Sequence, residues 1–134
     1  MPHEFVLSNA VVVAPDRAFH GAVRVVDGRI AELREGGAVH PGEIDCGRDH
    51  LLPGLVELHT DNLERHLSPR PGVRWPRRAA FAAHDGEFAL AGATTVLDAL
   101  RVGSMEDETL GAYAEDALTA LRELAALGLL RADH

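Results

Sequence analysis

The sequence contains no lysine, since all 13 of its basic residues are arginine. A Schiff-base lysine, a P-loop lysine and a carbamylated lysine are therefore excluded within this chain. The single cysteine, Cys46, excludes an internal disulfide and suits a reducing compartment, so we expect a cytoplasmic protein. Aromatic residues make up only 4% of the chain, so any core must be built from Val, Leu and Ala.

Long apolar runs and an excess of positive charge are also missing. No apolar run approaches the roughly 18 residues of a membrane span, and the N-terminal residues lack the features of a signal peptide. The net charge of −8 argues against non-specific nucleic-acid binding and against an anionic membrane surface as a partner. With 46% apolar and 25% charged residues over 134 positions, the chain has the composition of a soluble globular protein.

The first fifty residues carry the pattern of short strands. β-branched residues run from Val6 to Val13, and a second apolar segment runs from Gly21 to Val26. A third, Arg29 to Leu33, is separated from the second by Asp27-Gly28, which is a strong two-residue hairpin signal. After Gly-rich loops, a short apolar patch follows at residues 44–46. We expect a small antiparallel β unit over residues 1–50.

From residue 51 the pattern changes to strands that alternate with helices. Leu51 to His59 is expected as a buried strand, and Ala93 to Leu100 as a second apolar strand. Between them, a polar, Pro-rich loop leads into a helix over Arg77 to Ala91, which Gly92 ends. This alternation predicts an α/β fold with a parallel sheet and crossover helices.

A last helix is predicted near the end of the chain. Ser104 to Asp107 has the pattern of a capping box, and an apolar stripe at helical spacing begins at Leu110. Gly128 is expected to end this helix. Two parallel strands do not make a closed architecture, so we expect the chain to hold an incomplete sheet.

His59 and Asp61, at the end of the first long strand, suggest half of a metal site. Alternate residues of a strand point to one face, so both side chains can project beyond the carboxyl end of a parallel strand, where α/β sites form. One imidazole nitrogen and one carboxylate oxygen favour Mn, Fe or Zn. The alternative is a strand-terminal histidine beside an aspartate that caps a turn, since two ligands do not complete a site.

Five arginines lie in a stretch that has no acidic residue between Glu64 and Asp85, and they are Arg65, Arg70, Arg74, Arg77 and Arg78. Guanidinium groups bind phosphate oxygens in bidentate fashion, so this stretch suits an anionic substrate. The candidate substrate contacts are Asn62, Arg70, Arg74 and Arg78. The alternative is a solvated, Arg-rich loop without a ligand.

Three further residues are candidates to support the ligands from a second layer: His66, His84 and Asp85. His66 follows Asp61 in the same loop, whereas His84 and Asp85 lie on the predicted helix. Because His84 shares a helix face with Phe81 and Phe88, a core histidine satisfied by a neighbour is the alternative for it. Asp85 could instead orient a neighbouring group or act as a capping residue.

Several of these segments together resemble the amidohydrolase superfamily, in which a β-sandwich flanks a (β/α)8 barrel. They are Leu51-Leu52-Pro53-Gly54-Leu55-Val56-Glu57-Leu58-His59, Pro69-Arg70-Pro71, Ala83-His84-Asp85 and Gly92 to Ala99. Asp61 stands where most members have a second histidine. With this departure the chain resembles one branch in particular, the phosphonate-metabolism M proteins.

The resemblance implies a metal-dependent hydrolase of the carbon–phosphorus lyase pathway. Its substrate would be a phosphorylated sugar phosphonate, alpha-D-ribose 1-methylphosphonate 5-triphosphate, from which it would release pyrophosphate. His59 and Asp61 would be ligands of a divalent metal, Mn or Zn or else Fe. The alternatives are an amidohydrolase that acts on C–N bonds and a non-catalytic fragment that docks on a partner chain.

The fold implied is a small N-terminal β-sandwich portion, residues 1–50, followed by the first two β/α units of an incomplete (β/α)8 barrel, residues 51–134. A complete barrel needs about 250 residues. We therefore expect the chain to be inactive alone. We also expect it to associate through exposed strand edges or with a complementary C-terminal chain.

Overall fold

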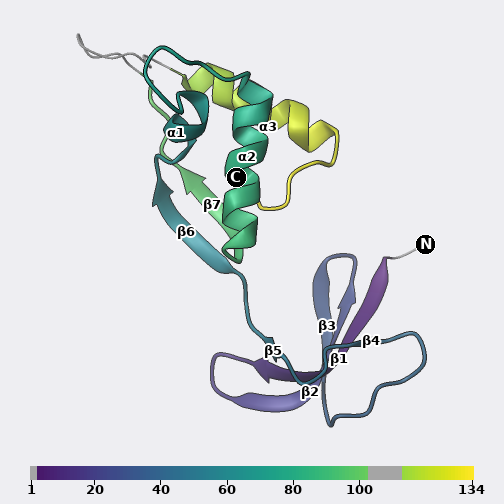
Figure 1. Cartoon of the computed structure of the whole chain (residues 1–134). Helices are drawn as coiled ribbons and strands as arrows, with labels where there is room; N and C mark the ends of the chain where they lie inside the picture. The colour runs from purple at the N-terminus through teal and green to yellow at the C-terminus, as the bar shows by residue number, and fades with distance from the viewer. Residues whose placement is uncertain (1–2, 103–112) are drawn as a thin grey trace. The chain divides into compact units, whose positions relative to one another are not determined.

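The computed structural model describes residues 3–102 and 113–134 and contains two compact units (Figure 1). One unit spans Met1–Pro53 and the other Gly54–His134. Among the described residues, the first unit contains strands and no helix, and the second combines two strands with three helices. The predicted class, an α/β chain with a β unit followed by β/α units, is confirmed.

The first unit is a single five-stranded sheet. Its strands are β1 (Glu4–Val13), β2 (Ala18–Val26), β3 (Arg29–Glu35), β4 (Ile44–Asp45) and β5 (His50–Leu51). The order is β3-β2-β1, with antiparallel pairing, and β4 and β5 both pair with β1. The expectation of a purely antiparallel unit is wrong, because β4 and β5 run parallel to β1. The loop over residues 36–43 carries the chain back across the sheet, and such a return makes parallel pairing possible.

The hairpin between β2 and β3 turns at the two residues that the sequence indicated. Asp27 has φ 48° and Gly28 has φ 75°, so both central residues take the left-handed conformation that a tight type I′ turn requires. Glycine meets this demand without steric cost, and aspartate tolerates it better than most residues. The predicted hairpin is confirmed.

The second unit is built on a parallel pair of strands, β6 (Leu55–Thr60) and β7 (Ala93–Asp98). Between them lie α1 (Leu63–Leu67) and α2 (Arg77–Leu90), and α3 (Ala114–Ala126) follows β7. The parallel pairing with a helical crossover is the predicted arrangement. Two details differ: the loop before α2 contains the short helix α1, and the predicted strand 51–59 is broken at Pro53-Gly54, so that β5 and β6 belong to different sheets.

The predicted burial of β6 is wrong. Leu55 is 62% exposed and Leu58 is 73% exposed, although both are large apolar residues. The reason is the small size of the sheet, in which β6 pairs only with β7 among the described residues. Parallel strands become buried when neighbouring strands and helices cover both faces, and that cover is absent from this part of the structure.

The core of the second unit lies among its helices. Leu63 and Leu67 of α1 pack with Phe81 of α2 and with Leu124 of α3 in one buried cluster. Gly92 (φ 85°) and Gly128 (φ 63°) follow α2 and α3 and end them, as predicted. The predicted capping box at residues 104–107 and Leu110 lie outside the described residues.

A third parallel segment begins beside β7. Asp133 forms an isolated parallel bridge with Thr95. Its amide donates to the carbonyl of Thr94, at 3.0 Å, and its carbonyl accepts from the amide of Val96, at 2.7 Å. The segment after α3 therefore occupies the position of a strand next to β7. Across the residues that the structure describes, no helix is long and apolar enough to span a membrane.

Candidate metal and anion sites

His59 and Asp61 lie at the carboxyl end of β6, where the sequence placed them. Both are exposed, whereas Thr60 between them is buried. The carboxylate of Glu57 accepts a hydrogen bond from the backbone amide of His59, at 3.0 Å, and so fixes the backbone at this position. The arrangement leaves an imidazole and a carboxylate open to a ligand, and it supplies no third ligand from the described residues.

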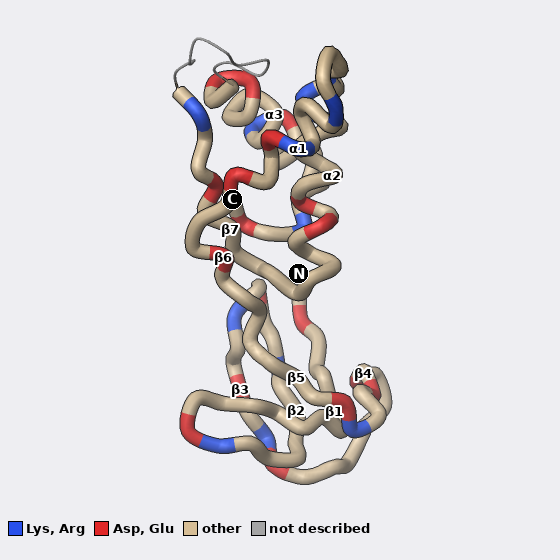
Figure 2. Tube along the Cα trace, turned by 60° about the vertical axis from the view of Figure 1, so that its left-hand side comes forward, with Lys and Arg blue, Asp and Glu red and all other residues tan. Residues whose placement is uncertain are grey.

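The arginine stretch divides into two groups in the structure. Arg65 meets Glu87 at 2.8 Å, and Arg78 meets Glu123 at 3.3 Å, so both have acidic partners from other elements. Arg70 and Arg74 are exposed on the loop between α1 and α2, where Figure 2 shows blue segments of the tube. They are the two guanidinium groups of this stretch most open to an anion.

The remaining member of the stretch and the predicted contact Asn62 both have local structural roles. Arg77 lies between two acids of α3, 3.6 Å from Asp116 and 3.5 Å from Glu123. Asn62 precedes α1, and its backbone amide donates to Oγ1 of Thr60 at 3.1 Å. The stretch has no acidic residue of its own, but acidic side chains from α3 lie next to it in the structure.

His66 is engaged by helix α2. Its Nε2 lies 2.9 Å from Oε2 of Glu87, the same carboxylate that meets Arg65. The hydrogen bond to His66 and the nearby arginine lower the pKa of Glu87. The contact connects α1 to α2 and directs this imidazole toward Glu87.

His84 lies inside the second unit. Its side chain is fully buried, with Phe81 and Phe88 at ring-centroid distances of 5.8 Å and 5.0 Å. Nε2 of His84 lies 2.6 Å from Oδ1 of Asp98, at the end of β7. This is the environment of a core histidine with a charged neighbour.

Asp98 also binds a second histidine, His134. Nδ1 of His134 lies 2.7 Å from Oδ2 of Asp98, so each carboxylate oxygen meets a different imidazole. The ligand atoms of His84, Asp98 and His134 all lie within 4.8 Å of one another. In the described part of the chain, this is the one group of His, Cys, Asp and Glu side chains that converges in this way.

Asp85 fixes the segment that carries His134. Its Oδ1 accepts from the amides of Arg131, at 2.9 Å, and Ala132, at 3.0 Å, and its Oδ2 meets the Arg131 guanidinium at 2.9 Å. Burial alone would raise the pKa of Asp85, but these hydrogen bonds outweigh it and lower the pKa. Asp85 therefore orients a neighbouring segment, which was one of its two predicted roles.

The same balance holds for Asp98 and His134. Burial opposes the charged form of Asp98, but the hydrogen bonds from His134 and His84 outweigh this effect and hold the pKa at about 2. Burial likewise disfavours a charged His134, and the hydrogen bond to Asp98 leads the effects that raise its pKa. The two groups favour opposite charges in contact.

Asp98 and His134 were not singled out in the sequence. Asp98 could have been found, because it ends β7 at the same edge at which Asp61 follows β6, and the carboxyl ends of parallel strands meet there. His134 gave no signal, since its partners are 36 and 49 positions away and only the fold brings them together.

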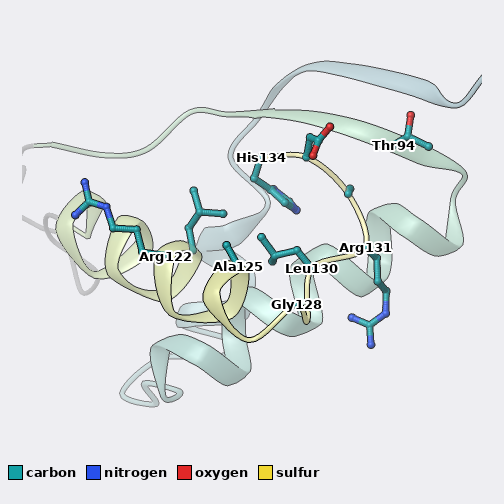
Figure 3. Close-up of a pocket in the computed structure, with 10 residues that line it drawn as sticks. Thr94, Arg122, Ala125, Gly128, Leu130, Arg131 and His134 are labelled. Atoms are coloured by element: carbon teal, nitrogen blue, oxygen red, sulfur yellow. The ribbon is translucent and has the colours of Figure 1, made fainter. Parts of the chain in front are cut away.

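Two hollows reach His134. The larger, of about 590 Å³, lies between the end of α3 and the segment that follows it, with Arg122 and Ala125 across from that segment (Figure 3). The other, of about 260 Å³, is lined by Asp98 and His134 together with apolar residues such as Phe81 and Leu121. The second therefore opens directly onto the pair of charged groups.

Comparison with known proteins identifies one curated relative. The alpha-D-ribose 1-methylphosphonate 5-triphosphate diphosphatase of Escherichia coli (strain K12) is 36% identical over 134 residues, which cover 96% of this chain and 34% of that protein. The chain thus spans about a third of the length of the relative it matches. No family model matches the chain. The predicted resemblance is confirmed, and the chain is related to this diphosphatase over its own length.

One solved structure has a similar fold, and two others give weaker matches. A crystal structure of an uncharacterized protein matches with a TM-score of 0.56 and 18% identity, covering 98% of this chain and 31% of that one. A D-hydantoinase matches with a TM-score of 0.37 and 14% identity, over 92% of this chain and 31% of the other. The L-hydantoinase (dihydropyrimidinase) of Arthrobacter aurescens gives 0.37 and 16%, over 92% and 39%.

Proposed function

We propose that this chain supplies part of the active site of a metal-dependent hydrolase that releases pyrophosphate from alpha-D-ribose 1-methylphosphonate 5-triphosphate. The observation that carries the proposal is the 36% identity to the diphosphatase across 96% of the chain. His59 and Asp61 lie at the carboxyl end of a parallel strand, which is where the sites of α/β enzymes form. A cytoplasmic setting suits its single cysteine.

His59 and Asp61 are the residues that would hold the metal. A neutral imidazole and a carboxylate are ligands that Mn²⁺, Zn²⁺ and Fe²⁺ accept, and both side chains are open to solvent. The hydrogen bond from the His59 amide to Glu57 limits the movement of that backbone. When bound, the ion would supply a Lewis acid for a phosphoryl oxygen and an activated water.

Arg70 and Arg74 are the proposed contacts for the triphosphate. Each is exposed on the loop that follows α1, whereas Arg78 is already paired with Glu123. A guanidinium can hold two phosphate oxygens at once, which orients the substrate as well as attracting it. Arg78 is proposed as a weaker contributor, because Glu123 already pairs with it, and Asn62 as a further contact, because its hydrogen bond to Thr60 uses the backbone amide and not the side chain.

We expect no turnover by the 134 residues alone. Two protein ligands leave a divalent ion mostly bound to water, so that both metal affinity and activation of the hydrolytic water are weak. The relative that performs the reaction is about three times as long as the matched segment. The remaining ligands and the catalytic base are therefore expected from residues outside this chain.

A chimeric enzyme tests the proposal. The matched segment of the E. coli diphosphatase is replaced by residues 1–134, and pyrophosphate release from the triphosphate is measured with Mn²⁺ or Zn²⁺ added. We expect turnover by the chimera and none by the 134 residues alone. Changing His59 or Asp61 to Ala should abolish turnover and lower metal content, whereas the control His50→Ala should do neither.

Two results would contradict the proposal. Full metal occupancy and normal turnover in both the His59 and the Asp61 variants would remove these residues from the site. Turnover of a cyclic amide in place of the triphosphate, by a folded chimera, would replace phosphoryl transfer with C–N cleavage.

A further inference from the structure

We propose that His84, Asp98 and His134 bind a divalent transition-metal ion at a site separate from His59 and Asp61. The three residues come from three elements: α2, the end of β7 and the segment after α3. They are called the buried triad below. The ion would join these elements inside the second unit.

The geometry of the buried triad favours a site over a chance cluster. The side chains of His84, Asp98 and His134 are 0%, 9% and 1% exposed. Their ligand atoms converge within 4.8 Å, from positions in the sequence that are up to 50 residues apart. Exposed clusters of polar groups arise easily on a surface, whereas burying three of them together is costly unless they interact closely.

The donor set fits a transition metal. Two imidazole nitrogens and one carboxylate oxygen are the ligands of many Zn²⁺ sites, at metal–ligand distances of about 2.0–2.2 Å. The contacts of 2.6 Å and 2.7 Å to Asp98 are hydrogen bonds, so each imidazole nitrogen must move away from the carboxylate by roughly 0.7 Å before these atoms can surround a tetrahedral ion. Binding would replace the protons that the imidazoles now share with the carboxylate.

A second carboxylate stands behind one of the ligands. Oδ1 of Asp85 lies 3.4 Å from Nε2 of His134, the ring nitrogen that does not face Asp98. Histidines that bind metals commonly donate their other N–H to such a carboxylate, which fixes the ring and its tautomer. Asp85 is itself held by the amides of Arg131 and Ala132, so this support is in place before an ion arrives.

The charge around the buried triad suits a cation. Asp98 and Asp85 bring two carboxylates to a small volume, and the guanidinium of Arg131 meets Asp85 at Oδ2, on the oxygen that does not face His134. The hollow of about 260 Å³ lined by Asp98 and His134 offers a path from solvent. His59 and Asp61 are exposed and are not part of this convergent group, so the two sites can be tested separately.

The experiment is a Zn²⁺ titration of the 134-residue chain, with Co²⁺ absorption as a readout of ligand geometry. We expect one ion that is lost, with affinity about a hundredfold weaker or more, in Asp98→Asn and in His134→Gln. His59→Gln is the matched control and should leave this ion in place. His134→Gln keeps a neutral polar side chain and leaves the carboxylate of Asp98 in place, so it keeps the test valid if Asp98→Asn fails to fold.

The outcomes separate this inference from the proposed function. Equal Zn²⁺ affinity in the parent chain, Asp98→Asn and His134→Gln would overturn it, and so would the absence of Zn²⁺ binding by the folded chain. Loss of the ion in His59→Gln instead would also overturn it, while supporting the ligand role of His59. Loss of the ion in His134→Gln but not in His59→Gln supports the buried triad, whatever result the chimera gives.

Discussion

Asp133 extends the parallel sheet by bridging Thr95 of β7, with its amide and carbonyl bonded to Thr94 and Val96. One residue earlier, the amide of Ala132 donates to the buried carboxylate of Asp85 on α2. The register of this third parallel segment is therefore set from two sides, by the edge of β7 and by a helix. Asp85 is the group that connects them.

Replacing Asp85 should destabilise the second unit. In Asp85→Asn the amide group faces the donors of Arg131 and Ala132 with only one acceptor oxygen, so at least one charge-assisted hydrogen bond is lost. We expect the free energy of unfolding to fall by about 2–3 kcal/mol. Urea unfolding followed by the fluorescence of Trp75, the one tryptophan, reports on this unit.

Asp116→Asn is the control for that measurement. Asp116 lies on α3 with its side chain 53% exposed and meets Arg77 at 3.6 Å. Exposed ion pairs contribute little, so a change within about 0.5 kcal/mol is expected. A change in Asp85→Asn as small as that in Asp116→Asn would mean that the hydrogen bonds of Asp85 contribute little to the stability of the second unit.

The first unit should lose stability in acid because of Glu43. Its carboxylate accepts from Arg34, from the Ser8 hydroxyl and from the His40 amide, and these bonds lower its pKa from 4.5 to about 2. A carboxyl whose pKa is lowered in the folded state stabilises the fold above its unfolded pKa. This contribution is present above about pH 4.5 and is lost as the pH falls toward 2.

Glu43→Gln should flatten that acid dependence. The amide signals of Ser8 and Ala10, followed by NMR from pH 6 to pH 2, report on the first unit. Glu35→Gln is the control, because its carboxylate meets Arg17 where both side chains are more than half exposed. An unchanged acid transition in Glu43→Gln would assign the acid sensitivity to other carboxylates.

The loop arginines should bind polyphosphate unequally. With inorganic tripolyphosphate as the probe at low salt, Arg70→Ala and Arg74→Ala should each weaken binding about tenfold or more, since each removes a charge-assisted contact. Arg78→Ala should weaken it less, because Glu123 already partners Arg78. Calorimetric titration gives the constants, and Arg122→Ala on α3 is the control. Equal affinity in all variants would leave the loop as a solvated surface.

Local signals in the sequence predicted the elements of this fold well. Asp27-Gly28 located the hairpin, Gly92 and Gly128 located two helix ends, and alternation predicted the parallel pair β6–β7. The errors came from pairing at a distance. The parallel placement of β4 and β5 depends on where the chain returns to β1, which no local pattern encodes.

The candidate site shows the same limit. His59 and Asp61 could be proposed from the sequence because they are neighbours on one strand end, and Arg70 and Arg74 because they share a loop. Arg78 was grouped with them by sequence, but its partner Glu123 lies on α3 and becomes visible only in the fold. Asp98 and His134 meet for the same reason, across elements whose packing the sequence pattern does not determine.

The last prediction is that the chain associates in solution, with a second copy as the partner. Leu55, Val56 and Leu58 of β6 and Leu97 of β7 are all more than half exposed, although the strands are apolar. The outer edge of β6 has no neighbour among the described residues, and a free edge offers unpaired backbone donors and acceptors to another strand.

Light scattering should show an average mass that rises with protein concentration. Leu58→Asp should lower that mass, because a charge on a strand that pairs with another copy opposes association. Leu127→Asp is the control, since Leu127 is similarly exposed but caps the end of α3 and belongs to neither strand. A monomer at all concentrations in the parent chain would show that the exposed strand pair is tolerated without a partner.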